Sequence, residues 1–395
     1  MMKIYIGLLL LISNYVSAQN ISGKWRGEFA IQDSIKVPFN FEIDKNNAVT
    51  LINGAERFSA GKAVIDKDSL FIPLDEFDNI LAFKINGALL NGVLRKQDGS
   101  ADLAILKAEK GKTYRFKETT KKPDKDFSGK YEVIFNPEDG KGEVAIGLFE
   151  QKGKKLTATF MKPSGDTRFQ EGIVEGNKFY LSSFIGSTPG YYYGKFKDDG
   201  EIKGEQVGTK MRQYFKGKLN PDAVLPDAYS FGRVKDSAFN FLLPDMAGKS
   251  VSLNDDRFKN KVVIIAITGT WCPNCIDEAK FLSPWYAKNK DRGVEIIAVH
   301  FERSADTAYA HKMMARYKER FNIEYTQLFG GTTSKEDIMK ALPSLDKFSA
   351  FPTTIFVDKS GKVAKVHTGF SGPATGKYYD EFIKEFEMEI DALVK

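Results

Sequence analysis

The fold is decided by the stretch VVIIAITGTWCPNC at residues 262–275. Val262 to Ile267 form an unbroken apolar run, which predicts a strand buried on both faces of a sheet. Cys272-Pro273-Asn274-Cys275 follows closely and is expected to open a helix, since Pro273 fits a first turn where a missing N–H costs nothing. Cys272 then lies beside unpaired backbone N–H groups and the positive end of the helix dipole, which favour its thiolate form.

These are the only two cysteines in the 395-residue chain, and two residues separate them. A disulfide between them closes a tiny loop, worth roughly 2 kcal/mol in the chain-entropy model against about 4.7 kcal/mol for a 100-residue loop. A structural staple is therefore a poor explanation, and redox chemistry is the better one. In that chemistry Cys272 attacks a disulfide, and the more shielded Cys275 resolves the resulting mixed disulfide.

The pattern around this motif predicts an α/β domain over residues 237–395. Further strands are expected at 294–299, 353–357 and 362–367, and helices at 273–290, 305–321 and 376–392. This β–α–β–α–β–β–α order predicts a central mixed sheet. Pro284 is expected to kink or restart the first helix without touching the chemistry.

Residues 1–18 have the features of a signal peptide. Lys3 supplies the positive charge, an apolar region follows, and Val16-Ser17-Ala18 is a small-residue cleavage site. A membrane anchor is the less favoured alternative, because the apolar stretch is shorter than the roughly 18 residues a span needs. We therefore expect a periplasmic or otherwise exported protein without stable membrane insertion. The formal charge of +6 is spread over mixed charges, which argues against a nucleic-acid partner.

The sequence of residues 19–220 predicts an all-β region of two tandem repeats, 19–120 and 121–220. A linker is expected at 221–236. Alternating strands are separated by the turn dipeptides Asn86-Gly87, Asp98-Gly99, Asp139-Gly140 and Asp199-Gly200. Similar features recur about 106 residues apart in the same order. They are Ser22-Gly23-Lys24-Trp25 with Ser128-Gly129-Lys130-Tyr131, and the closing segments Tyr114-Arg115-Phe116 with Tyr214-Phe215-Lys216. A scaffold, a homo-oligomer contact or a substrate-docking module is the expected role, and the Tyr191-Tyr192-Tyr193 cluster is expected to pack across strands.

Residues 237–395 resemble the thioredoxin-like disulfide oxidoreductases of the TlpA and ResA type. The resemblance rests on three segments: Phe239-x-Phe241-x-x-Pro244, Trp271-Cys272-Pro273-Asn274-Cys275 and Phe351-Pro352-Thr353-Thr354. It implies a thioredoxin-like fold in which Pro352 is cis and faces the cysteine pair. It also favours a reductase of exported proteins' disulfides, restored by a membrane thiol-transfer protein of the DsbD or CcdA kind, although Pro273-Asn274 between the cysteines does not fix the redox potential and hence the direction. The redox-active disulfide Cys272–Cys275 would serve without a further cofactor.

The motif's neighbours complete the predicted site. Trp271 is expected to shield one side of the cysteine pair. Many thioredoxins carry a buried acid six residues before the first cysteine, where this chain has Ala266. ResA-like members have a glutamate three residues after the second cysteine, and Glu278 stands there. Glu278 could take the proton of the resolving thiol, or it could be a solvated residue on the helix surface, since Asp277 is an equally acidic neighbour.

Three alternatives are less favoured than a thiol–disulfide oxidoreductase. A zinc site would have to recruit His300, His311 or His367 from separate elements, so no metal is expected. Peroxide reduction would need an activating threonine hydroxyl three residues before the attacking cysteine. This chain has Gly269 at that position before Cys272. The last alternative is a ligand- or partner-binding β protein with an accessory thioredoxin domain.

Overall fold

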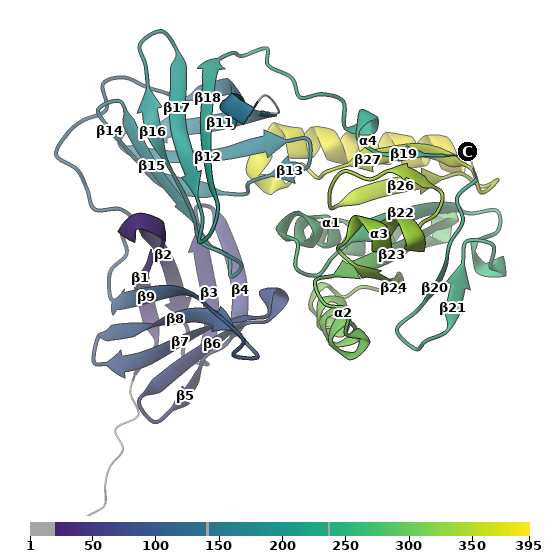
Figure 1. Cartoon of the computed structure of the whole chain (residues 1–395), viewed down its shortest axis with the longest axis horizontal. Helices are drawn as coiled ribbons and strands as arrows, with labels where there is room; N and C mark the ends of the chain where they lie inside the picture. The colour runs from purple at the N-terminus through teal and green to yellow at the C-terminus, as the bar shows by residue number, and fades with distance from the viewer. Residues whose placement is uncertain (1–19, 140–141, 236–237) are drawn as a thin grey trace, which may run out of the picture.

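The computed structural model describes residues 20–139, 142–235 and 238–395 and contains two β units and an α/β domain (Figure 1). The predicted signal peptide lies outside the described residues, as does Gly140 of one predicted turn. Among the described residues no helix is long and apolar enough to cross a membrane.

The first β unit is a nine-stranded antiparallel sheet in the order β4-β3-β2-β1-β9-β8-β7-β6-β5. Large aromatic side chains such as Trp25, Phe39 and Phe41 are fully buried inside it. The strands are β1 (Gly23–Ala30), β2 (Lys36–Ile43), β3 (Ala48–Asn53), β4 (Glu56–Lys62), β5 (Val64–Asp66), β6 (Ser69–Leu74), β7 (Asn79–Asn86), β8 (Leu89–Lys96) and β9 (Asp102–Lys110).

The second β unit is a closed barrel. Each long strand pairs with the next in the chain, and β18 pairs back onto β10. Closure leaves no free edge among these strands. They are β10 (Gly129–Phe135), β11 (Glu143–Lys152), β12 (Lys155–Lys162), β14 (Gln170–Glu175), β15 (Lys178–Ser183), β16 (Gly190–Phe196), β17 (Glu201–Val207) and β18 (Arg212–Leu219), with the short β13 (Gly165–Asp166) beside β12.

The first and last long strands pair in both units, β1 with β9 and β10 with β18. Gly23 and Gly129 open the equivalent strands β1 and β10. That the units are copies of one sequence stays a prediction.

One predicted correspondence is wrong. Tyr214-Phe215-Lys216 lies in β18, but Tyr114-Arg115-Phe116 lies beyond β9 and is not a strand. Arg115 instead sits buried between the two units, where its guanidinium donates to the hydroxyl of Ser182 at 3.1 Å and to the carbonyl of Pro38 at 3.3 Å. Burial lowers the pKa of Arg115 to about 10.

The α/β domain has a five-stranded mixed sheet in the order β24-β23-β22-β26-β27. Its sheet strands are β22 (Val262–Thr268), β23 (Val294–Glu302), β24 (Thr326–Thr332), β26 (Thr353–Val357) and β27 (Val363–Thr368). Its helices are α1 (Pro273–Asn289), α2 (Thr307–Phe321), α3 (Lys335–Ala341) and α4 (Lys377–Val394). Four short strands lie outside this sheet in two pairs: β19 (Arg233–Val234) with β25 (Leu345–Lys347), and β20 (Leu242–Pro244) with β21 (Ser250–Ser252).

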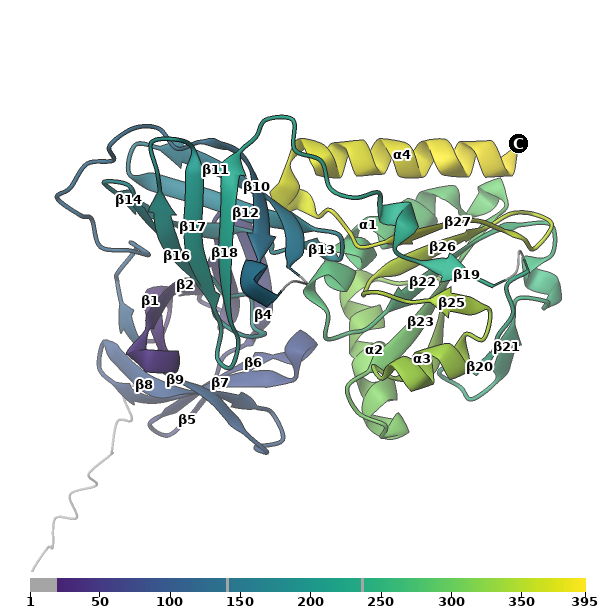
Figure 2. The same cartoon turned by 45° about the horizontal axis from the view of Figure 1, so that its top comes forward.

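Every residue of β22 is buried, as predicted for a central strand. Ile264 and Ala266 share a core with α1 and α4, while Ile265 and Ile267 pack with α3 and the segment around Phe239. In Figure 2, α4 runs along one side of the sheet; its N-terminal end lies beside the second β unit and its C-terminal end points away from it.

Three details of this domain differ from the prediction. The edge strand β24 and the short α3 were not predicted. α1 continues through Pro284 without interruption, so the predicted restart does not occur. The second half of the predicted linker belongs to the α/β domain, because β19 pairs with β25 and Tyr229 packs on His367.

Candidate active site

Cys272 is the N-cap of α1, and Pro273 occupies the first turn, as predicted. The backbone N–H of Cys275 donates to Cys272 Sγ at 3.4 Å. Cys272 Sγ also lies 3.9 Å from the carbonyl oxygen of Phe351. Both cysteines are free thiols; Cys272 keeps 6% of its surface exposed and Cys275 none. The first sulfur is thus the accessible one, and it meets the unpaired N–H groups of the helix start.

Cys275 is held in a different environment. Burial raises its pKa well above the ordinary value, and the nearby Cys272 and Glu278 raise it further. Its carbonyl oxygen accepts a hydrogen bond from the hydroxyl of Tyr317 at 2.7 Å. The second thiol therefore keeps its proton at neutral pH until a base removes it.

Pro352 and Trp271 lie around the pair. The Phe351–Pro352 peptide bond is cis, as the resemblance implied. Trp271 is half-buried, donates from its indole N–H to the carbonyl of Phe301 at 2.9 Å, and packs edge-on against Phe351. Arg303 places its guanidinium over the Trp271 ring, 4.6 Å from the ring centroid. These contacts hold the indole in one orientation beside the cysteines.

Glu278 is buried in the interior, so the alternative of a solvated surface residue is wrong. Its Oε1 accepts from the hydroxyl of Thr354 at 2.6 Å. Burial raises the pKa of Glu278 to about 7, against a smaller lowering by Thr354. A carboxyl with that pKa, one helical turn beyond Cys275, can exchange a proton at neutral pH.

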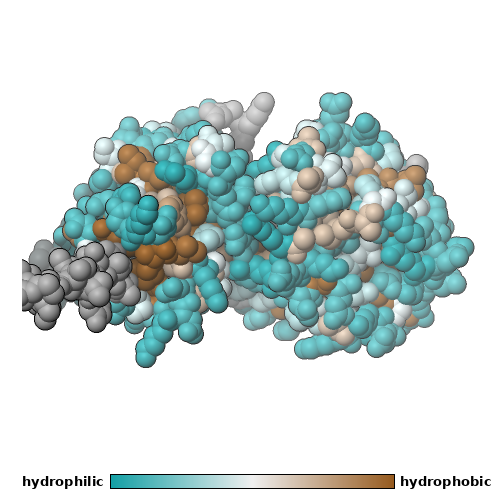
Figure 3. Space-filling model, turned by 90° about the horizontal axis from the view of Figure 1, so that it is seen from below, coloured by the Kyte–Doolittle hydropathy of each residue, from teal (hydrophilic) through white to brown (hydrophobic). Residues whose placement is uncertain are grey.

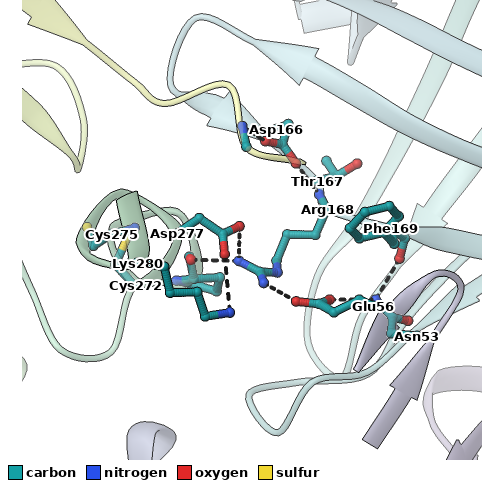
Figure 4. Close-up of polar contacts among 12 residues, drawn as sticks. Asn53, Glu56, Asp166, Thr167, Arg168, Phe169, Cys272, Cys275, Asp277 and Lys280 are labelled. Carbon is teal, nitrogen blue, oxygen red and sulfur yellow. Dashed lines mark hydrogen bonds and ion pairs between the residues drawn. The ribbon is translucent and has the colours of Figure 1, made fainter. Parts of the chain in front are cut away.

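Asp277 has a separate role that the sequence did not reveal. It forms a buried ion pair with Arg168 of the second β unit, and Arg168 also pairs with Glu56 of the first (Figure 4). Arg168 donates a further hydrogen bond to the carbonyl of Pro273 at 2.8 Å. One guanidinium therefore joins all three parts of the molecule at the redox motif.

Glu302 is another buried carboxylate that sequence reasoning missed. It accepts from the backbone N–H of Thr270 at 3.0 Å and from its hydroxyl at 2.8 Å, which holds the turn leading into Trp271. Burial raises its pKa to about 7. The available signal was its position: β23 neighbours β22 in parallel, so Glu302 ends its strand at the same sheet edge as the motif.

The three histidines lie on separate elements, β23, α2 and β27. Burial lowers the pKa of His300 to about 4, so it is neutral. The described residues contain no cluster of three or more histidine, cysteine or acidic side chains arranged to hold a metal.

Comparison with known proteins assigns the α/β domain to a family. Residues 234–366 match the model of the AhpC/TSA family. The chain is 30% identical over 162 residues to the thiol-disulfide oxidoreductase ResA of Halalkalibacterium halodurans, covering 40% of this chain and 81% of that protein. It is 33% identical over 130 residues to the ResA of Bacillus subtilis, covering 33% and 64%.

Among solved structures, the thioredoxin domain of a thiol-disulfide oxidoreductase from Bacteroides vulgatus is 23% identical, with a TM-score of 0.29, and covers 38% of this chain and 99% of that one. Residues 234–366, which the family model matches, carry the cysteine motif, the buried strand β22 and the cis proline. The chain therefore belongs to the ResA-like, thioredoxin-fold family of thiol–disulfide oxidoreductases and is itself an enzyme of that kind.

Proposed function

We propose that this oxidoreductase is an exported reductase of protein disulfides and that its working group is the Cys272–Cys275 pair. The observation that carries the proposal is the asymmetry of the two thiols. Cys272 caps a helix and receives the N–H of Cys275, whereas Cys275 is fully buried with a raised pKa. An exposed nucleophile followed by a shielded, protonated resolving thiol is the arrangement that two-step disulfide exchange needs.

In the first step the Cys272 thiolate attacks one sulfur of a client disulfide. The client S–S bond breaks, a mixed disulfide forms on Cys272, and the first client thiolate leaves and takes up a proton. In the second step Cys275 loses its proton to Glu278 and attacks Cys272 Sγ, which releases the second client thiol. The two electrons gained by the client come from the dithiol, which ends as the Cys272–Cys275 disulfide.

The position of Glu278 supports its role as the proton acceptor. It follows Cys275 by three residues on the same helix, and its pKa of about 7 lies close to neutral pH. Ala266, on the neighbouring strand β22, supplies no alternative acid at the position that many thioredoxins use.

A reductase needs its dithiol restored after each cycle. The resemblance to the TlpA and ResA type supports a membrane thiol-transfer protein of the DsbD or CcdA kind as the donor. Export rests on the signal-peptide features of residues 1–18. The proposed cycle uses no cofactor beyond the cysteine pair.

The environment of Gly269 argues against peroxide reduction. A Cβ at this position would lie 2.5 Å from the Trp271 indole nitrogen and 2.7 Å from the Phe301 carbonyl. A threonine therefore cannot take this position without moving Trp271.

Association of copies through the β region stays a prediction. Figure 3 shows hydrophobic surface gathered over the first β unit, where Leu89 and Ile105 are exposed by 48% and 69%. Sedimentation of the wild type beside an Ile105→Lys variant tests it.

Trapping tests the proposed function. A Cys275→Ser variant should accumulate client proteins as mixed disulfides on Cys272, and mass spectrometry of the adducts identifies them. The Cys272→Ser, Cys275→Ser double variant is the matched control and should capture none and reduce no insulin disulfides. Unchanged insulin reduction by that double variant would overturn the proposal and favour a β protein with a passive thioredoxin domain.

A further inference from the structure

A cleft of about 280 Å³ lies between the start of α1 and one end of the second β unit. The α/β domain contributes Cys272, Pro273 and Asn274 to its lining. The second β unit contributes three segments: 166–170 before β14, 183–190 between β15 and β16, and 206–211 between β17 and β18. These connections lie at one end of the barrel, because alternate turns of an up-and-down barrel share an end. The barrel thus forms the wall opposite the reactive thiol.

The barrel approaches the redox motif closely. A Cβ added to Gly165 would lie 2.1 Å from Asn274 Nδ2, and one added to Gly369 would lie 2.5 Å from the carbonyl of Pro163. With 6% of its surface exposed, Cys272 is reached through the cleft, and a folded protein surface cannot lie flat against it.

The lining offers no free charge. Its two charged side chains are Asp166 and Arg168, and both are occupied internally. Arg168 pairs with Asp277 and Glu56, while Asp166 accepts the backbone N–H groups of Gly372 and Arg168, each at 2.6 Å. Apolar side chains including Phe184, Ile185, Val207 and Met211 make up much of the remaining wall.

Two glutamines in this wall have unused acceptors. Gln170 is 1% exposed, and its Nε2 donates to the carbonyl of Thr167 at 2.7 Å. Its Oε1 has no donor among residues 20–139, 142–235 and 238–395, and the same holds for the buried Oε1 of Gln206. Leaving a buried acceptor unpaired is unfavourable, so a pair of them in one cleft calls for a donor from outside.

Backbone N–H groups of an extended peptide match this requirement. An extended chain advances about 3.3 Å per residue and presents N–H groups along its length, while its side chains alternate between opposite faces. It can therefore donate to buried amide oxygens and still place apolar side chains against a wall.

We propose that this cleft binds an extended, uncharged segment of the client chain, with Gln170 and Gln206 accepting its backbone N–H groups and its cysteine beside Cys272. The second β unit then selects unfolded or mobile client segments. This inference rests on the proposed function and names its substrate class.

The test compares two disulfides with the full-length protein. One is a neutral nonapeptide whose single central cysteine forms a mixed disulfide with 2-mercaptoethanol, and the other is hydroxyethyl disulfide, which has no peptide backbone. Loss of one hydrogen bond should lower the ratio of kcat/KM for the peptide to kcat/KM for hydroxyethyl disulfide about fivefold in Gln170→Leu and in Gln206→Leu. Gln213→Leu is the matched control, because Gln213 faces Gln206 across β17 and β18 but does not line the cleft, and its ratio should equal that of the wild type.

A ratio unchanged in both glutamine variants would overturn the inference while leaving the reductase function intact. If Gln170→Leu fails to fold, the ratio measured for Gln206→Leu alone decides the test. The Gln206 side chain is less buried, so its replacement should disturb the fold less. A second measurement locks the same peptide into a helix with lactam bridges, which should lower its kcat/KM at least fivefold; equal rates for both forms would also overturn the inference. Wild-type protein that reduces neither probe would instead refute the proposed function.

Discussion

The guanidinium of Arg168 donates to the carbonyl oxygen of Pro273, 2.8 Å away, so a residue of the second β unit reaches into the redox motif itself. The same guanidinium pairs with Asp277 in α1 and Glu56 in β4, whose side chains are 6% and 8% exposed. The Arg168 guanidinium therefore joins the motif to both β units, alongside the hydrogen bond from the Gly372 N–H to Asp166 and the ion pair of Arg320 with Glu76.

Removing that cation should loosen the molecule. Arg168→Ala leaves the buried carboxylate of Glu56 without a counter-ion and leaves Asp277 with only the part-exposed Lys280, 3.5 Å away, which costs about 3–5 kcal/mol. We expect Tm to fall by roughly 10 °C and the junctions between parts to become sensitive to protease. The Tm of Arg168→Lys should lie between those of the wild type and Arg168→Ala, since lysine keeps the charge but loses the forked geometry of the guanidinium.

Arg57→Ala is the control for this experiment. Arg57 adjoins Glu56 on the same strand but is exposed and donates to backbone carbonyls at its own hairpin. Its loss should leave Tm near that of the wild type. An Arg168→Ala protein as stable as Arg57→Ala would contradict the assigned role.

Glu278→Gln should slow turnover. The amide cannot accept the proton of Cys275, whose pKa burial holds well above the ordinary value. We expect kcat for protein-disulfide reduction to fall about a hundredfold and the inflection of kcat near pH 7 to disappear. Glu381→Gln, on the exposed side of α4, is the control. A pH profile that Glu278→Gln leaves unaltered would exclude Glu278 as the base.

Thr354→Val should move the same inflection upward. The Thr354 hydroxyl donates to Glu278 at 2.6 Å and lowers its pKa, so losing this donor raises the pKa further. The kcat profile of the variant should rise at higher pH than that of the wild type. Thr354→Ser keeps the hydroxyl and should restore the wild-type profile. An inflection at the same pH in the valine variant would refute the coupling.

Glu278 should also make stability depend on pH. Its pKa is raised from 4.5 in the unfolded chain to about 7 in the fold, so the folded state binds the extra proton. The stabilisation that comes from binding this proton is fully present below pH 4.5 and is lost as pH rises through about 7. The free energy of unfolding falls by about 3 kcal/mol in all over this range. Glu278→Gln should therefore gain stability relative to the wild type between pH 5 and 8. Urea unfolding across that pH range measures the difference in free energy of unfolding between Glu278→Gln and the wild type. A difference that does not change with pH would contradict the prediction.

Gly269→Ala should disturb the candidate active site because the added methyl group clashes with Trp271. The added Cβ would lie 2.5 Å from the Trp271 indole nitrogen, so the hydrogen bond from Trp271 to Phe301 must break. We expect a lower Tm and a shifted tryptophan emission. At Gly208 the nearest atom to an added Cβ is 3.9 Å away, so Gly208→Ala should melt like the wild type. Equal melting of the two alanine variants would refute the steric argument.

The parts of the fold that were predicted correctly have local signals. The apolar run of β22, the cysteines at a helix start and the period of α2 are each visible within a few residues. The missed elements lack such signals. β24 is an edge strand containing Gly330 and Gly331, and α3 has only seven residues. Arg115 looked like part of a strand because its aromatic neighbours alternate, but its guanidinium bonds to carbonyls far along the chain.

The sequence by itself determined the thioredoxin-like domain, the placement of the cysteine pair at a helix start and the glutamate one turn beyond it, because helix starts and helical spacing are properties of neighbouring residues. The tertiary structure alone decided that Glu278 is buried while Asp277 pairs with Arg168. It alone also placed the second β unit across the cleft from Cys272. Arg168 and Asp277 are 109 residues apart, and their pairing depends on how the three parts pack against one another. No local pattern of charge or hydrophobicity encodes that packing.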